Sequence, residues 1–385
     1  MVTRIPIAPE VIKWARERNN LSVSEAAELL KCDHQTLQKI ENSELMPSAG
    51  LFRRMSDVYL LPEATLLRDT PPADRALPKD FRSFDGNAVS LSYETIATIR
   101  RVEARQDALA ALAEVDEAVI APNLPIHSLK ESPDKLGATF RKQIGFEVVD
   151  QLSFTPSKAF TQWRQLVENM GISVYVEPMG EDDTRGVSLY FNDFPAIVID
   201  KNERLYGARL FTLFHELAHL LVRQAGISNL NGKNSVEAFC NKFSSAFLMP
   251  VEAVQSVFDL EKLQDGEPTI QQLEFAAAKL CVTISQIALR LEQLEYVGDG
   301  YFKRIASQLK PPAPKKKSEP PKIPFKYRYL TAAGHNFPGT VLDSLGRGEI
   351  DTVDASRMLE LAPTHFKPVK TELDARRAEL VNAQE

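Results

Sequence analysis

Residues 209–219 read Arg209-Leu210-Phe211-Thr212-Leu213-Phe214-His215-Glu216-Leu217-Ala218-His219. Two histidines four positions apart lie on the same face of a helix, so both imidazoles can reach one metal ion. Glu216 follows the first histidine, where a carboxylate can act as a general base on a water at the metal. The spacing therefore predicts a zinc-binding helix with His215 and His219 as ligands and Glu216 as the catalytic residue.

A second interpretation of the two histidines is that they fill polar gaps on a buried helix face. The residues around them are apolar and include Leu213, Phe214, Leu217, Ala218, Leu220 and Leu221. Two unpaired imidazoles in such surroundings would cost free energy. The chain has only six histidines, so a chance match to the motif is rare. A metal site is therefore the favoured interpretation.

A catalytic zinc site needs a third protein ligand and an open position for water. In metzincins the third ligand is a histidine six residues beyond the second, but Ala225 occupies that position here. The metzincin class is therefore excluded.

Glu237, in a helix predicted over residues 235–248, is the best candidate for the third ligand. It would share a helix face with Asn241 and complete a His2Glu site. The same residue could instead form a capping box with Asn234, because Asn at the N-cap and Glu three residues later is a common helix start. Spacing alone leaves both roles open. Two further acids rank lower because they follow a helix-ending proline, and these are Glu252 and Asp259.

Strand patterns precede the zinc helix. Alternating or apolar runs cover residues 172–176, 186–191 and 196–200, with a turn over 192–195. They predict a small, mainly antiparallel sheet followed by a helix over about 203–222. An extended substrate would pair with a sheet edge beside that helix, and residues 187–191 are the candidate edge. An internal strand is the alternative interpretation of this segment.

The N-terminal part has the rhythm of short packed helices. Ser22 and Glu25 fit a capping box at the start of the second helix. A break at residues 31–33 is followed by the apolar stripe of Leu37 and Ile40. This pattern over residues 10–68 predicts a helix-turn-helix domain.

Composition and periodicity divide the chain into five parts. We predict a helix-turn-helix domain over 1–70, a helical connector over 71–135, a zincin-like metallopeptidase domain over 136–300, a Pro/Lys-rich linker over 301–324 and a small helical region over 325–385. Further helices are predicted over 92–112, 133–144, 156–170, 270–280 and 284–295. The fold class is therefore α+β and multidomain, with all-α parts at both ends of a zincin-like domain.

The composition indicates in which compartment the protein acts and which partners it can bind. Of its 385 residues 44% are hydrophobic and 25% charged, and the net charge of −6 gives no general attraction to nucleic acid or anionic membranes. The three cysteines form neither a CxxC pair nor a disulfide framework. The most apolar stretch, 210–222, falls short of the roughly 20 residues that span a bilayer. We therefore expect a cytoplasmic protein with no membrane partner, whose oligomeric state stays open.

Three segments resemble the ImmA/IrrE family of metallopeptidases, which is often fused to an XRE-type helix-turn-helix. They are the 209–219 string, Asp80-Phe81-Arg82 with the helix ending near Gln106, and Glu237-Ala238-Phe239-Cys240-Asn241-Lys242-Phe243-Ser244-Ser245-Ala246-Phe247-Leu248-Met249-Pro250. The resemblance implies a gluzincin-like site with one zinc ion per chain and favours Glu237 as the third ligand. It also implies cleavage of a transcriptional repressor. Cys240 stands where alanine is usual in this family, and its thiol removes no ligand.

The N-terminal domain resembles phage-repressor-type helix-turn-helix domains. This resemblance places a recognition helix over about 33–42, preceded by Val23 and Ser24 at the start of the helix before it. The residues expected to face DNA are His34, Gln35, Gln38 and Lys39. Residues 1–68 contain nine Lys/Arg and nine Asp/Glu, so attraction to phosphates is weak. A helical module that contacts protein is the alternative.

Two functions follow from these expectations. The first is a zinc-dependent endopeptidase of gene regulation that cleaves a DNA-binding regulator. The second is a DNA-binding transcriptional regulator, or an antitoxin-like protein, whose zincin domain is sensory and not proteolytic. A purely structural metal domain fits least, because the HExxH spacing leaves Glu216 free and the coordination sphere open.

Overall fold

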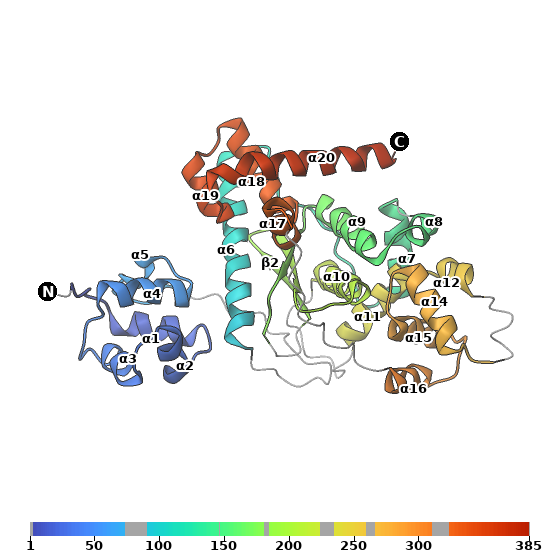
Figure 1. Cartoon of the computed structure of the whole chain (residues 1–385), viewed down its shortest axis with the longest axis horizontal. Helices are drawn as coiled ribbons and strands as arrows, with labels where there is room; N and C mark the ends of the chain where they lie inside the picture. Colours follow the sequence, from blue (N-terminus) through green and yellow to red (C-terminus); the bar gives the residue numbers. More distant parts are fainter. Residues whose placement is uncertain are drawn as a thin grey trace. The chain divides into compact units, whose positions relative to one another are not determined.

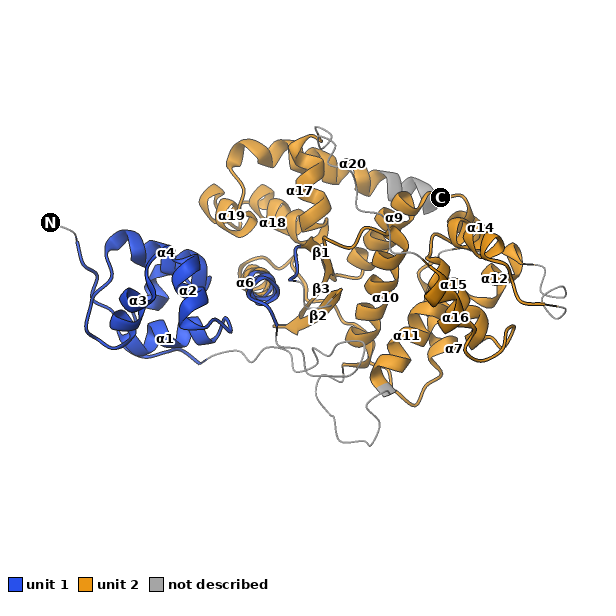
Figure 2. Cartoon of the chain, turned by 60° about the horizontal axis from the view of Figure 1, so that its bottom comes forward, with its two compact units in different colours: residues 1–104, 178–184 blue, residues 105–177, 185–385 orange. Residues whose placement is uncertain are grey.

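The computed structural model describes residues 3–73, 91–145, 147–180, 185–223, 235–258, 266–309 and 323–384 (Figure 1). The chain forms two compact units (Figure 2). The first comprises residues 1–104 and 178–184, and the second comprises 105–177 and 185–385. Three sequence features, Asp80-Phe81-Arg82, Asn234 and Asp259, lie outside the described residues, as does most of the Pro/Lys-rich segment.

Five short helices form the N-terminal part of the first unit. They are α1 (Pro9–Glu17), α2 (Val23–Leu29), α3 (His34–Glu41), α4 (Ala49–Tyr59) and α5 (Glu63–Leu66). The capping box between Ser22 and Glu25 is present as predicted, and Asp33 caps α3. Buried side chains such as Leu37 and Ile40 fill the core between the helices. The expected helix-turn-helix layout is confirmed.

The long helix α6 (Tyr93–Val115) carries a buried glutamine that contacts the sheet of the second unit. Gln106 Nε2 donates hydrogen bonds to the carbonyl oxygens of Leu189 and Phe194, at 3.2 and 2.5 Å. These carbonyls belong to two neighbouring strands, so one side chain ties both strands to the second half of α6.

The sheet has three strands in the order β1-β3-β2, namely β1 (Ser173–Glu177), β2 (Gly186–Phe191) and β3 (Phe194–Asp200). β2 pairs with β3 in antiparallel orientation, whereas β1 pairs with β3 in parallel orientation. The sheet is therefore mixed, and not mainly antiparallel as predicted. The reason is that the β2–β3 hairpin turns the chain back into the direction of β1, which pairs with β3 instead of β2. Strand β2 consequently lies at an edge of the sheet.

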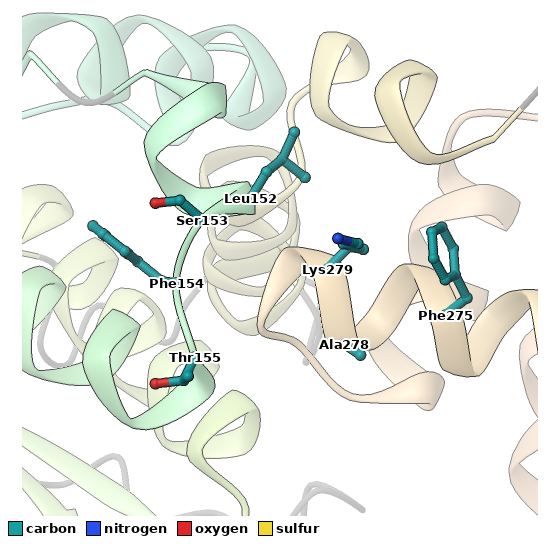
Figure 3. Close-up of a pocket in the computed structure, with 7 residues that line it drawn as sticks. All are labelled: Leu152, Ser153, Phe154, Thr155, Phe275, Ala278 and Lys279. Atoms are coloured by element: carbon teal, nitrogen blue, oxygen red, sulfur yellow. The ribbon is translucent and has the colours of Figure 1, made fainter.

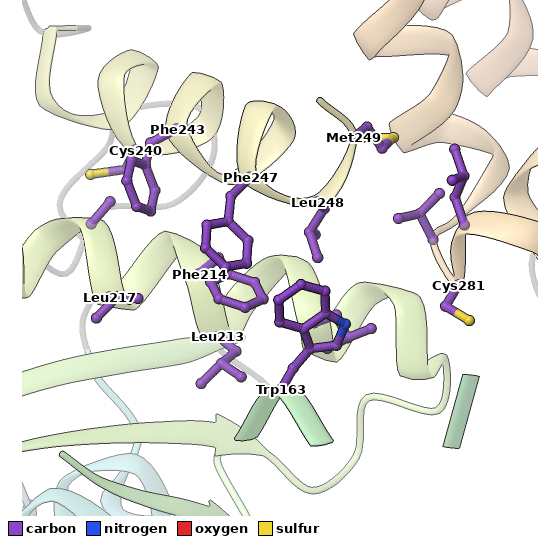
Figure 4. Packing of buried hydrophobic residues seen from close by; sticks show 14 of the residues in the cluster. Trp163, Leu213, Phe214, Leu217, Cys240, Phe243, Phe247, Leu248, Met249 and Cys281 are labelled. Atoms are coloured by element: carbon purple, nitrogen blue, oxygen red, sulfur yellow. The ribbon is translucent and has the colours of Figure 1, made fainter. Parts of the chain in front are cut away.

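Helix α10 (Tyr206–Val222) packs against strands β2 and β3 and against two helices, α9 (Pro156–Asn169) and α11 (Ser235–Leu248). Helix α7 (Pro133–Gln143) packs on α11. Aromatic rings from α9, α10 and α11 meet at the centre (Figure 4). The Phe214 and Phe247 rings stack with centroids 3.9 Å apart, and the Trp163 ring meets both of them edge-on at 5.3 and 5.1 Å. This cluster fixes α11 against α10.

Five further helices extend this core. They are α8 (Val148–Leu152), α12 (Val251–Val257), α14 (Ile270–Leu280), α15 (Ile284–Gln293) and α16 (Tyr301–Gln308). The buried Gln151 amide donates to the carbonyl oxygens of Leu248 and Leu280, which links α8 to the ends of α11 and α14. Helices α8, α12 and α16 are too short to give a clear periodic signal in the sequence.

The C-terminal helices pack on β1 and α9. They are α17 (Phe325–Ala333), α18 (Asn336–Arg347), α19 (Thr352–Leu359), a 3-10 turn (Pro363–His365) and α20 (Phe366–Gln384). The buried Arg164 guanidinium donates to the carbonyl oxygens of Val174, Thr331 and Ala332. Glu168, also buried, accepts from the backbone N–H and the Nδ1 of His335, at 2.8 and 3.0 Å. A charged cluster therefore joins this region to the sheet layer.

Gly334 makes that junction possible. Its φ of +77° lies in the left-handed region, and a Cβ at this position would collide with the Glu168 carboxylate and with the Val174 carbonyl oxygen. Two further findings concern the described residues as a whole. The three cysteines are free, and no described helix is long and apolar enough to cross a membrane.

We expect Arg164→Ala to lower the free energy of unfolding by about 3–5 kcal/mol, because Glu168 would keep a buried charge without its guanidinium partner. Urea unfolding followed by circular dichroism measures this loss. The control is Arg304→Ala, which removes an exposed ion pair with Glu267 and should cost about 0–1 kcal/mol. Equal losses in the two variants would contradict the importance of the buried cluster.

Candidate metal centre

Helix α10 is built from apolar residues on most of its surface, and its polar side chains share one side. Among its buried residues are Leu210, Leu213, Phe214, Leu217, Leu220 and Leu221. His215 and His219 are partly exposed, with 16% and 21% of their side-chain surface accessible. The helix ends at Arg223, which adopts a left-handed conformation and donates its backbone N–H to the carbonyl of His219. Burial of the apolar face thus orients both imidazoles toward the same opening.

Glu237, on the first turn of α11, lies opposite the two histidines. Its Oε2 is 3.2 Å from His215 Nε2, and its Oε1 is 3.3 Å from His219 Nε2. The two Nε2 atoms are 3.1 Å apart. The three side chains thus offer two nitrogens and a carboxylate within 4.8 Å of one another.

This group of donor atoms suits a zinc ion. Ligands held at about 2.0–2.1 Å in tetrahedral geometry lie about 3.3 Å from each other. The two imidazole nitrogens, 3.1 Å apart, are close to that spacing, and each of them lies 3.2 or 3.3 Å from a different oxygen of the Glu237 carboxylate. Glu237 has 48% of its side-chain surface exposed, so the carboxylate side of the group faces solvent. The donor set therefore suits a catalytic metal with an open position.

Asn241 orients one of the histidines. Its Oδ1 lies 3.0 Å from His215 Nδ1, so that a proton on Nδ1 would be donated to Asn241 and Nε2 would be left as the donor to a metal. Asn241 stands one helical turn after Glu237, and the two share the face predicted from the sequence. The Cys240 thiol, buried in α11, forms a side-chain hydrogen bond with His219. Each imidazole therefore has a partner on α11 besides Glu237.

The electrostatics of the group favour an ionised carboxylate. Burial by itself would raise the pKa of Glu237, but its hydrogen bonds to His215 and His219 outweigh burial and hold that pKa far below the usual value. The pKa of His219 is raised above its usual value, because its contacts with Cys240 and Glu237 outweigh burial. Glu237 is thus in the state that binds a cation.

Glu216 lies beside the edge strand. It is 8% exposed, and its carboxylate makes no hydrogen bond to the part of the chain that the structure describes. A Cβ on Gly186 would lie 3.2 Å from Glu216 Cγ and would collide with Thr212 Cγ2. Glycine at the start of β2 therefore lets the strand pass close to the proposed base.

The other acids considered in the sequence do not join this group. Glu252 is exposed on α12 and is not among the three residues that come together. Asn234, the alternative capping partner of Glu237, lies outside the described residues. The contacts of Glu237 with His215 and His219 fit a role as ligand.

A separate pocket lies between α8 and α14 and contains none of the predicted site residues (Figure 3). Its volume is about 350 Å³. The lining residues are Leu152, Ser153, Phe154, Thr155, Phe275, Ala278 and Lys279. The Lys279 ammonium lies over the Phe275 ring at 5.9 Å, which partly covers the one large exposed apolar side chain of the pocket.

The residues proposed to face DNA form a continuous exposed surface of α3. His34, Gln35, Gln38 and Lys39 are all exposed, whereas Leu37 and Ile40 are buried on the opposite face. Ser24 is exposed at the start of α2, and Val23 is half-buried. The four polar side chains are thus available to a partner.

Two side chains near the metal group escaped the sequence analysis. The guanidinium of Arg223 lies over the ring of Tyr190 on β2, with its Cζ atom 4.4 Å from the ring centroid. The four-residue spacing of His215, His219 and Arg223 could have revealed Arg223, because these positions follow one helix face. Nothing in the sequence could have indicated that Tyr190 faces the same helix.

Family models match two segments of the chain. Residues 167–292 match the IrrE N-terminal-like domain, a peptidase family model, and residues 10–68 match a helix-turn-helix domain. No curated protein matches the chain. The first segment includes α10 and the part of α11 that carries Glu237, and the second covers α1 to α5. The chain therefore contains a segment similar to a peptidase-family domain and a segment similar to a helix-turn-helix domain, the combination that the resemblance predicted.

Proposed function

We propose that residues 136–300 form a zinc metalloendopeptidase domain in which His215, His219 and Glu237 hold one zinc ion. The observation that carries this proposal is the meeting of two imidazole nitrogens, 3.1 Å apart, with the two oxygens of one carboxylate, at 3.2 and 3.3 Å. The match of residues 167–292 to a peptidase family model supports the same function. The ligand set is of the His2Glu type found in gluzincin-like sites.

Glu216 is the proposed general base and general acid. Zinc, when bound, would lower the pKa of a water molecule and polarise the substrate carbonyl. The Glu216 carboxylate would accept a proton from the attacking water and deliver it to the leaving amide nitrogen. Its position beside Gly186, without a hydrogen-bond partner among the described residues, leaves the carboxylate available for both transfers.

The substrate we propose is an extended polypeptide lying along β2. This strand is at the sheet edge, so one row of its backbone N–H and C=O groups has no partner strand among the described residues. The Tyr190 side chain lies against Arg223, and a Cβ added at Gly186 would meet Glu216, so this face of β2 is turned toward α10. A polypeptide paired with β2 would therefore run beside the metal helix.

A transcriptional repressor or related regulator is the proposed protein substrate, acted on in the cytoplasm. The support for this choice is the helix-turn-helix domain in the same chain, which could bring the peptidase to DNA or to a DNA-bound protein. The regions flanking the peptidase domain would serve as a connector over 71–135, a linker up to residue 324 and a helical region over 325–385. The linker begins after α16 and not at residue 301 as predicted, because Tyr301 and Ile305 are buried in the core.

A second function is a DNA-binding regulator or antitoxin-like protein whose zincin domain is sensory. The exposed polar face of α3 favours it, since Gln and Lys side chains suit contacts with base edges and phosphates. The equal numbers of acidic and basic residues in this domain weaken phosphate attraction. The two functions differ in whether Glu216 is required.

The metal site predicts stoichiometric zinc in the purified protein and its loss in His215→Ala. Asn241→Ala should retain the metal but bind it about 10- to 100-fold more weakly, because His215 loses the partner that orients it. Competition with a chromogenic chelator measures both effects. His127→Ala, which removes a partly exposed histidine paired with Glu131, is the control and should bind zinc like the wild type. Unchanged affinity in all three variants would exclude this site.

The peptidase function predicts that Glu216→Gln cleaves its substrate about 10²- to 10⁴-fold more slowly while still binding zinc, because the proton acceptor is lost. The assay incubates the zinc-loaded protein with each purified regulator encoded beside its gene and identifies fragments by mass spectrometry. Glu252→Gln, an equivalent change at an exposed acid outside the metal group, should cleave normally. Equal behaviour of the wild type and Glu216→Gln toward every regulator would favour the sensory function.

The α3 surface predicts sequence-selective DNA binding that weakens as salt rises. Gln38→Ala should relax the preference at one base pair by about 1–3 kcal/mol, whereas Lys39→Ala should weaken binding to all sequences alike. Mobility-shift titrations on the DNA upstream of the gene, at two salt concentrations, measure these effects. Absence of selective binding in the wild-type protein would indicate a protein-docking module.

A further inference from the structure

Arg223 continues the ligand-bearing face of α10. It follows His219 by four residues, and its backbone N–H donates to the His219 carbonyl at 3.1 Å. Its φ of 42° places it in the left-handed conformation that ends the helix. One helical turn rises about 5.4 Å, so the arginine begins only one turn beyond the second histidine.

The guanidinium of Arg223 is held in place without a carboxylate. It lies over the Tyr190 ring at 4.4 Å, and its Nη2 makes a long hydrogen bond of 3.4 Å to the Leu124 carbonyl. Its Nε is buried and has no hydrogen-bond partner among the residues that the structure describes. Within the described ranges no acid forms an ion pair with this side chain.

Several buried arginines of the described residues pair with acids. Such pairs are Arg16 with Glu41, Arg100 with Glu103, Arg164 with Glu168 and Arg290 with Asp134. The buried Arg141 instead donates to the Gln151 side-chain oxygen and to the backbone carbonyls of Phe247 and Glu147. The acids on the elements that carry or contact Arg223 have other partners or roles. Asp193, in the β2–β3 turn, contacts the Tyr190 hydroxyl at 3.4 Å, and Glu216 and Glu237 belong to the metal group. Arg223 therefore combines a fixed position with an unused positive charge.

We propose that Arg223 is a specificity-determining residue that binds a carboxylate of the polypeptide substrate. A guanidinium stacked on an aromatic ring has its plane fixed, and its remaining N–H groups can bind a carboxylate in bidentate fashion. A strand rises about 3.3 Å per residue, so one helical turn corresponds to about two substrate residues. The enzyme accordingly prefers Asp or Glu about two residues from the scissile bond. This inference rests on the proposed peptidase function.

A purely structural role for Arg223 is the competing explanation. A cation at a helix C-terminus interacts favourably with the helix dipole, and such a role needs no substrate carboxylate. The two explanations differ in one measurable property. Only substrate recognition makes the affinity for a ligand depend on that ligand's own charge.

The experiment uses the zinc-loaded full chain and pairs of short peptide hydroxamates, in which the hydroxamate binds the metal and needs no hydrolysis. The members of each pair differ only in glutamate or glutamine, placed one, two or three residues from the hydroxamate. Titration calorimetry gives the affinity of each. The variants are Arg223→Glu and the charge-conserving Arg223→Lys. The matched control is Arg357→Glu, the same charge change at an exposed arginine of α19.

At one of the three positions, we expect the wild type to bind the glutamate peptide at least about tenfold more tightly than the matching glutamine peptide, as for a charge-assisted hydrogen bond. Arg223→Lys should keep part of this preference, Arg223→Glu should abolish or reverse it, and Arg357→Glu should keep all of it. A wild type with no preference at any position, or a preference that survives in Arg223→Glu, overturns the inference while the proposed function stands. If neither peptide of any pair binds, the metal site itself fails and the inference fails with it.

Discussion

The stacking of Phe214 on Phe247 is the contact on which the rest of the site depends. It joins α10 to α11 with ring centroids 3.9 Å apart, and Trp163 closes the cluster from α9. Because Phe247 and Glu237 belong to the same helix, this packing also sets the carboxylate opposite His215 and His219. The metal group is therefore a product of the hydrophobic core, which brings its donor atoms together.

The local parts of this arrangement could be predicted from the sequence. The four-residue spacing of His215 and His219 depends only on helix geometry, and the Ser22 capping box depends only on neighbouring residues. Glu237 is different, because a helix-capping acid and a metal ligand look alike in sequence. Its proximity to the histidines is a contact between two helices, which the family resemblance suggested and the residue pattern alone did not.

The features that the sequence missed depend on contacts between distant segments. The strand periodicity of β1 gives no sign that it pairs with β3 in parallel orientation, and this pairing decides that β2 is an edge. Likewise, the periodicity of residues 325–385 predicts helices, but not the Glu168–His335 contact that joins them to α9. The position of Arg223 likewise depends on a contact between a helix end and a strand, because its guanidinium lies on the Tyr190 ring and has no acidic partner among the described residues.

The central claim is that two imidazoles and a carboxylate bind zinc while the nearby thiol does not. X-ray absorption spectroscopy at the zinc edge of the loaded protein tests it most directly. The account predicts only nitrogen and oxygen scatterers in the first shell, at about 2.0–2.2 Å, with the multiple-scattering pattern of two imidazoles. A sulfur scatterer at about 2.3 Å, which would require Cys240 as a ligand, or the absence of imidazole scattering would contradict it.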